Sequence, residues 1–106
     1  MGRPSAPGPD TGLTRATERQ FHEAVVDLAT VLGWRAYHTH NSRRSAPGWP
    51  DLCLVRGDRA LFRELKAEKG RVTPAQAEWL AALSGAGLDA GVWRPSDWPV
   101  IEESLR

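Results

Sequence analysis

Gly48-Trp49-Pro50-Asp51-Leu52 and Arg63-Glu64-Leu65-Lys66 flank two short apolar runs that meet at Gly57-Asp58. Apolar runs on either side of a Gly-Asp pair predict a β-hairpin with a two-residue turn. Pairing outward from this turn places Asp51 directly opposite Glu64. Because strand side chains alternate between faces, Lys66 is expected on the same face as both acids.

Two opposed carboxylates on one face need a compensating charge. Directly opposed residues have Cβ atoms about 4.5–5.5 Å apart, a separation at which like charges destabilise a sheet. A divalent cation compensates them well, since carboxylate oxygens suit Mg²⁺ or Mn²⁺. Lys66 beside such a site could stabilise a phosphate or help to activate water. The alternative interpretation is an exposed hairpin face whose acids and base partly neutralise one another.

The order of these motifs resembles a known nuclease pattern. Pro50-Asp51 followed by Glu64-Leu65-Lys66 is similar to the PD-(D/E)xK motif. The longer series, over roughly residues 17–98, resembles the VRR-NUC branch of that superfamily. The series consists of Gly48-x-Pro50-Asp51-Leu52, Glu64-Leu65-Lys66 and Gly70-Arg71-x-Thr73-x-x-Gln76-x-x-Trp79-Leu80.

This resemblance implies a metal-dependent DNA endonuclease with a restriction-endonuclease-like fold. Asp51, Glu64 and the backbone carbonyl of Leu65 would bind Mg²⁺ or Mn²⁺, and Lys66 would be the catalytic lysine. Gln76 would lie near the carboxylates as a hydrogen-bonding partner of the lysine, water or DNA. Single-domain members resemble Holliday-junction resolvases, so a homodimer acting on branched DNA is expected.

Composition indicates one ordinary globular domain. The chain has 106 residues, of which 41% are hydrophobic and 25% charged. Residues 1–13 are rich in Pro, Gly and Ser and predict a disordered tail, which leaves 14–106 as the domain. No membrane-spanning or signal segment is evident, so a cytoplasmic location is expected. The single cysteine, Cys53, cannot form an internal disulfide and is expected to be a small buried apolar residue.

Charge is distributed unevenly along the chain. The formal net charge is +1, but residues 35–71 contain nine Lys or Arg against four Asp or Glu. A basic segment around an acidic pair fits a polyanion held over a cation. The alternative is scattered surface charge.

Hydrophobic patterning predicts an α/β domain with a mixed β-sheet flanked by helices, in the order α-β-β-β-α-β-α. The first helix is expected over residues 17–32, where Thr17-x-x-Gln20 could form a capping box, and the first strand is expected over 34–39. After the hairpin, a second helix begins at Thr73 and ends near Gly85 and Gly87, a strand follows over 89–93, and a last helix runs through Ile101 and Leu105. Trp34, Trp79 and Trp93 are expected in the core.

The first helix offers two candidates for the accessory acid that the family carries there. At about 100° per residue, Glu18 falls on the apolar face with Phe21 and Val25, whereas Glu23 projects nearly opposite. Glu18 is therefore the preferred accessory acid. It could instead be a favourable charge at the helix N-terminus.

Basic loops are candidates for DNA contact. Arg43 and Arg44, placed among hydroxyl side chains just before the hairpin, suit phosphate oxygens, and Lys69 and Arg71 could continue the phosphate track. A merely solvated loop is the alternative. Trp49 could pack under the loop or stack on a base, and packing is the preferred interpretation.

His38 and Gln76 also have two interpretations each. His38 is expected near the active face and the DNA, or else as a surface histidine at a strand end; His38 and His40 together lack the further ligands of a zinc site. Gln76 could close a capping box with Thr73 as well as approach the carboxylates.

Two functions other than a nuclease are alternatives. The first is a non-catalytic DNA-binding or recruitment module, which the complete set of Asp51, Glu64 and Lys66 disfavours. The second is an interaction domain without a role in nucleic acid binding, which the basic segment disfavours.

Overall fold

The computed structural model describes residues 13–39 and 46–106. The helices are α1 (Glu18–Val31), α2 (Pro74–Gly85) and α3 (Trp98–Leu105), and the strands are β1 (Arg35–His38), β2 (Leu52–Arg56), β3 (Arg59–Leu65) and β4 (Asp89–Trp93). Short 3-10 turns, η2 (Leu13–Arg15) and η3 (Pro95–Asp97), precede α1 and α3. The predicted order α-β-β-β-α-β-α is confirmed.

In the described residues, the strands form one sheet in the order β1-β2-β3-β4. β1, β2 and β3 pair antiparallel, while β4 runs parallel to β3 and follows the α2 crossover. The hairpin register is the predicted one, with Arg56 opposite Arg59 and Val55 opposite Ala60. Gly57 has a φ of 62°, a conformation that glycine adopts without strain in this kind of turn.

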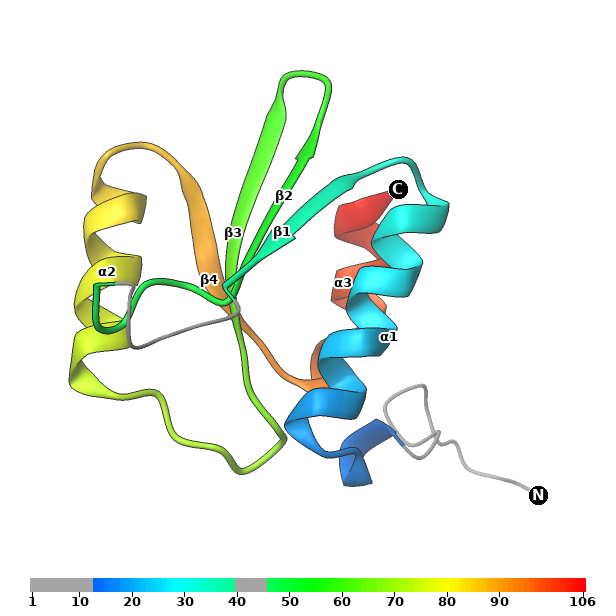
Figure 1. Ribbon diagram of the computed structural model, residues 1–106, viewed down its shortest axis with the longest axis horizontal. Coiled ribbons are helices and arrows are strands. Elements are labelled where there is room, and N and C mark those ends of the chain that lie inside the picture. Colours follow the sequence, from blue (N-terminus) through cyan, green and yellow to red (C-terminus); the bar gives the residue numbers. More distant parts are fainter. Residues whose placement is uncertain (1–12, 40–45) are drawn as a thin grey trace.

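Helices cover both faces of this mixed sheet. Figure 1 shows α2 on one side of the strands and α1 with α3 on the other. The main hydrophobic core lies on the α1 and α3 side, because alternate residues of β2 and β3 point there. It contains Phe21, Val25, Ala29, Trp34, Leu52, Leu54, Leu61, Leu65, Trp93, Ile101 and Leu105.

The tryptophans divide between the two faces. Trp34 and Trp93 belong to the core, as predicted, and Trp34 Nε1 donates to Leu105 O at 2.9 Å. The prediction that Trp79 is a core residue is wrong. Its ring is half-buried on the other face and meets Trp49 edge-on at a centroid distance of 4.9 Å. Trp49 also packs against Phe62, at 6.2 Å, which confirms the packing interpretation of Trp49.

The prediction that Cys53 is buried is also wrong, because this residue is half-buried. Leu52 and Leu54 point into the core, so the residue between them points to the opposite face. There α2 packs mainly on β4 and leaves β2 partly open. Partial burial still raises the pKa of the Cys53 thiol.

The two long helices begin at the predicted capping boxes. Thr17 Oγ1 accepts from Gln20 N–H at 3.1 Å, and Thr73 Oγ1 accepts from Gln76 N–H at 3.2 Å. Each glutamine side chain accepts from the N–H of its threonine in return. These reciprocal bonds satisfy backbone donors that a helix N-terminus leaves unpaired. In the part of the chain that the structure describes, no helix is long and apolar enough to cross a membrane.

Candidate active site at the open end of the hairpin

The two predicted carboxylates face each other at the end of the hairpin distant from its turn. The register pairs Leu52 with Arg63, and one further step places Asp51 opposite Glu64. Asp51 Oδ2 also accepts a hydrogen bond from the Leu65 N–H at 3.0 Å. At this position a hydrogen bond to the Asp51 side chain therefore takes the place of the next backbone hydrogen bond between β2 and β3.

Glu64 is a buried carboxylate with one free oxygen. Its side chain is 2% exposed. Oε2 accepts from Gln76 Nε2 at 2.9 Å and lies 3.5 Å from Lys66 Nζ. Oε1 is buried, and no described residue donates a hydrogen bond to it. A buried carboxylate oxygen without a partner is costly, so a ligand at this position would stabilise the site.

The environment of Glu64 opposes its ionisation. Loss of solvent raises the pKa of Glu64 first, and the neighbouring Asp51 raises it further, to about 8. Lys66 acts in the opposite direction but does not offset these effects. Without a cation, the pair therefore retains a proton near neutral pH that isolated carboxylates would release.

Glu64→Gln is expected to raise the melting temperature at pH 8 when divalent cations are absent. A folded-state pKa near 8 against an unfolded value near 4.5 means that the wild type loses stability as pH rises through this window. The loss is on the order of a few kcal/mol. The neutral amide of Glu64→Gln removes this loss of stability. The melting temperature of the variant, measured in a chelator from pH 5 to 9, should therefore depend less on pH than that of the wild type. A wild-type profile as flat as that of Glu64→Gln would contradict this prediction, and the exposed Glu103→Gln is the control.

A divalent cation fits these residues. Two adjacent carboxylates leave a net negative charge beside one lysine once both are ionised, as they are when a cation displaces the retained proton, and the free Oε1 of Glu64 supplies a hard oxygen ligand. Among the described residues, no group of three or more His, Cys, Asp and Glu could hold a metal. The donor set is therefore the Asp51 and Glu64 pair, with room for a backbone carbonyl, water and substrate oxygens.

Gly48 explains how the loop before Asp51 is held. Its φ is 87°, and a Cβ at this position would lie 2.4 Å from the carbonyl carbon and oxygen of Ala75 and 2.8 Å from Gln76 N. The loop therefore packs its backbone directly on the first turn of α2. On the other side, Thr39 N–H donates to Asp51 O at 3.0 Å. Asp51 is thus held between β1 and the helix that carries Gln76.

A groove of about 780 Å³ adjoins Asp51 on the α1 side. Its walls are Glu18, Arg19, His22, Glu23, His38, Thr39 and Asp51. Glu18 lines this groove and is exposed. The expectation that Glu23 projects away is wrong, since Glu23 lines the same groove and pairs with Arg19 at 3.4 Å. The reason is that α1 borders the groove with the edge formed by residues 18, 19, 22 and 23 rather than with its buried face.

His38 lies in the groove wall together with a residue that the sequence analysis did not select. The His22 and His38 rings meet edge-on at a centroid distance of 5.1 Å. His22 follows Glu18 by one helical turn, so the spacing of four residues was a signal that could have identified it. The structure therefore places His38 in the same groove as Asp51.

The predicted basic residues are placed only in part. Lys69 and Arg71 are exposed in the loop between β3 and α2. Arg43, Arg44 and His40 lie outside the described residues. The loop between β3 and α2 is held by hydrogen bonds of Arg94 and Glu68. No local sequence signal distinguished these two residues, because their partners are far away in the chain.

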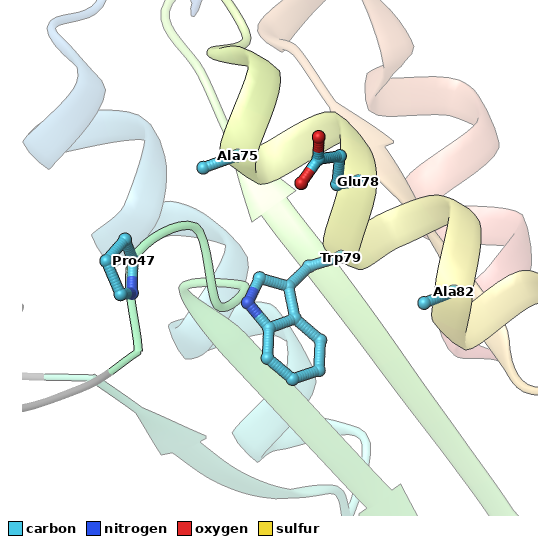
Figure 2. A pocket seen from close by; sticks show the side chains of 5 residues that line it. All are labelled: Pro47, Ala75, Glu78, Trp79 and Ala82. Carbon is cyan, nitrogen blue, oxygen red and sulfur yellow. The ribbon is translucent and has the colours of Figure 1, made fainter.

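A smaller hollow of about 260 Å³ lies between α2 and the loop before the hairpin. Figure 2 shows Trp79 reaching from α2 toward the loop at Pro47, with Ala75 and Ala82 along the helix. Glu78 is the acid among its lining residues. Without a second acid or a lysine in its lining, this hollow lacks the paired groups found at Asp51 and Glu64.

A mixed sheet that carries two opposed acids and a lysine at one end defines a nuclease-like α/β domain. The VRR-NUC domain model matches residues 4–97 of the sequence. Among solved structures, a chain described as a VRR_NUC domain protein superposes with a TM-score of 0.66 at 24% sequence identity, over 86% of this chain and 91% of that chain. The comparison with curated proteins gave no match.

The chain therefore belongs to the VRR-NUC domain family. The family match implies a nuclease-like protein with DNA as its substrate. The solved structure shows that the fold is shared.

Proposed function

We propose that this protein is a Mg²⁺- or Mn²⁺-dependent endodeoxyribonuclease that hydrolyses phosphodiester bonds in branched DNA such as Holliday junctions. The buried Glu64 carboxylate carries the proposal, because it lies opposite Asp51 and retains an oxygen without a partner. A protein that only binds DNA has no need of this costly arrangement.

Asp51, Glu64 and the carbonyl of Leu65 would hold the cation. When bound, the cation would stabilise negative charge on the reacting phosphate and lower the pKa of water. Gln76 fixes Glu64 through Oε2 and leaves Oε1 for binding. Because the same glutamine caps α2, the helix N-terminus and the carboxylate are positioned together.

Lys66 would be the catalytic lysine and would act by electrostatic stabilisation. Its ammonium is nearly buried and lies 3.5 Å from Glu64 Oε2, so its charge is poorly screened by solvent. From this position it can donate to a phosphate oxygen and orient the attacking water. Glu18, across the groove that ends at Asp51, would be the accessory acid.

Lys69 and Arg71, together with Arg43 and Arg44, would contact phosphates on either side of the cleaved bond. His38 would contact DNA from the groove wall. Such contacts hold a duplex in position without reading its sequence. DNA affinity should therefore fall steeply as salt concentration rises.

A homodimer would let two sites cut two strands of a junction. Each chain contributes one Asp51 and Glu64 pair, and a two-fold assembly would fix the distance between two such sites. Sedimentation of the protein with and without junction DNA tests this. A monomer under both conditions, at concentrations that support cleavage, would rule the dimer out.

The substrate preference is tested by incubating the protein with four-way junction, flap, linear duplex and single-stranded DNA in Mg²⁺ and in Mn²⁺. Paired symmetric incisions in the junction are expected, with slower cutting of linear duplex. Cleavage of linear duplex at the same rate would contradict branched-DNA specificity. DNA binding that depends on salt, without any cleavage, would identify a binding module instead.

A further inference from the structure

The turn that follows Lys66 is joined by Arg94 to the end of the neighbouring strand β4. This arginine comes directly after β4, and its Nη1 donates to Ala67 O at 2.9 Å and to Glu68 O at 3.1 Å. Glu68 in the turn also contacts the segment after β4, since its Oε1 accepts a hydrogen bond from Ser96 N–H at 2.9 Å. Two segments separated by more than 25 residues are thus joined by three hydrogen bonds.

The fastened turn packs against the stem of Lys66. Gly70 N–H donates to Ala67 O at 3.0 Å and closes the turn. A Cβ at Gly70 would lie 3.6 Å from Lys66 Cβ, so the turn passes directly beside the base of the lysine side chain. Lys66 N–H itself donates to Trp93 O at 3.1 Å. The backbone of Lys66 is therefore held by the residue next to Arg94, and the first carbon of its side chain lies beside the turn that Arg94 holds.

Arg94 is itself held in place. Its backbone N–H donates to Asp97 Oδ2 at 2.8 Å, at the start of η3. Its planar guanidinium donates from Nη1 to two carbonyl groups in a fixed direction, whereas a lysine ammonium at the same position is a flexible point charge. The geometry therefore depends on arginine and not on positive charge alone.

We propose that Arg94 is a positioning residue for cleavage, which acts by holding the 67–70 turn against Lys66. This inference rests on the proposed nuclease function. Lysine has a long flexible side chain, so its ammonium reaches a defined position only where the surrounding chain restricts it. Displacement of a catalytic group by about 1 Å can cost about 10²-fold in rate.

Arg94→Ala is expected to lower kcat by about tenfold or more while the Kd for DNA changes less than about threefold. The decisive readout is a double-mutant cycle with Lys66→Ala. If Arg94 acts through Lys66, removing it from the Lys66→Ala protein should change the residual rate by less than about twofold. An equal loss in both backgrounds, or no loss in the wild type, would overturn the proposal.

Four further variants separate positioning from general destabilisation. Arg94→Lys should recover only part of the rate, because an ammonium on a flexible side chain holds the two carbonyls less firmly than the planar guanidinium does. Glu68→Gln keeps an oxygen for Ser96 N–H and should act like the wild type, whereas Glu68→Ala should lower kcat. Arg59→Ala removes a comparable bond to a carbonyl, that of Ser104 at 2.8 Å, and should leave kcat of the folded protein unchanged.

Amide hydrogen exchange tests the contact without relying on activity. The Gly70 amide should exchange about tenfold faster in Arg94→Ala than in the wild type, and Arg59→Ala should leave it unchanged. Unchanged protection of Gly70 in Arg94→Ala would overturn the proposed positioning even in an active nuclease. If the wild type cuts no DNA, the proposed function fails, and faster exchange of Gly70 would then show only that Arg94 orders the turn.

Discussion

Replacing Lys66 by alanine is expected to reduce the rate of DNA cleavage by about 10²–10⁴-fold while DNA affinity changes less than about threefold. The ammonium is nearly buried beside Glu64, so it contributes little to the exposed field that attracts DNA. In the proposed mechanism it acts where charge develops on the reacting phosphate. Single-turnover cleavage and fluorescence anisotropy of labelled DNA measure the two effects separately.

Lys69→Ala is the matched control for this lysine. Lys69 is exposed three residues further along the chain. Its removal should weaken DNA binding and reduce the salt dependence by about one phosphate contact, with little change in kcat. Undiminished turnover of Lys66→Ala would disprove the catalytic role of Lys66.

Gly48→Ala is expected to be the most destabilising small substitution in the loop before Asp51, at about 3–4 kcal/mol. The residue has a φ of 87°, and the new Cβ would lie 2.4 Å from the Ala75 carbonyl. The loop would have to move away from α2, which would separate Asp51 from the helix that holds Glu64 through Gln76. Thermal unfolding should show a fall of about 15 °C or more.

Gly57→Ala supplies the control for backbone strain. Gly57 also has a positive φ, 62°, but no atom lies within 4 Å of a Cβ placed there. It should therefore cost only about 1 kcal/mol, which is the strain of the left-handed backbone itself. Equal destabilisation by the two substitutions would show that the close approach of the loop to α2 is unimportant.

The elements that the sequence predicted correctly depend on interactions between near neighbours. The two-residue turn at Gly57-Asp58 set the hairpin register and so placed Asp51 opposite Glu64. The capping boxes at Thr17 and Thr73 set the starts of α1 and α2. In each case, residues two to four positions apart determine the geometry.

The predictions that failed concern how elements pack on one another. Trp79 and Cys53 are apolar, but the sequence does not show that α2 covers β4 and leaves part of β2 open. Glu23 was assigned by the angle around α1, whereas the position of the groove depends on where α1 crosses the sheet. Arg94 shows the same limit, since its partners are more than 25 residues away.

Gln76 was left with two interpretations, and the structure shows both contacts at once. Its Oε1 accepts from the Thr73 N–H at 2.8 Å, while its Nε2 donates to Glu64 Oε2 at 2.9 Å. An amide has a donor and an acceptor, so one side chain can cap the helix and hold the carboxylate. The sequence indicated each contact separately but did not show that they are compatible.

Asp51 and Glu64 are proposed to hold a divalent cation for DNA cleavage, and Asp51→Asn tests this role most directly. Asparagine keeps an oxygen that can accept from the Leu65 N–H, so the hairpin should remain intact. The measurement is cleavage of a four-way junction by the wild type and this variant over a range of Mg²⁺ concentrations. We expect cleavage by the wild type that requires Mg²⁺ and is lost in a folded, DNA-binding Asp51→Asn protein. Cleavage by the wild type in a chelator, or equal cleavage by the variant, would contradict the account.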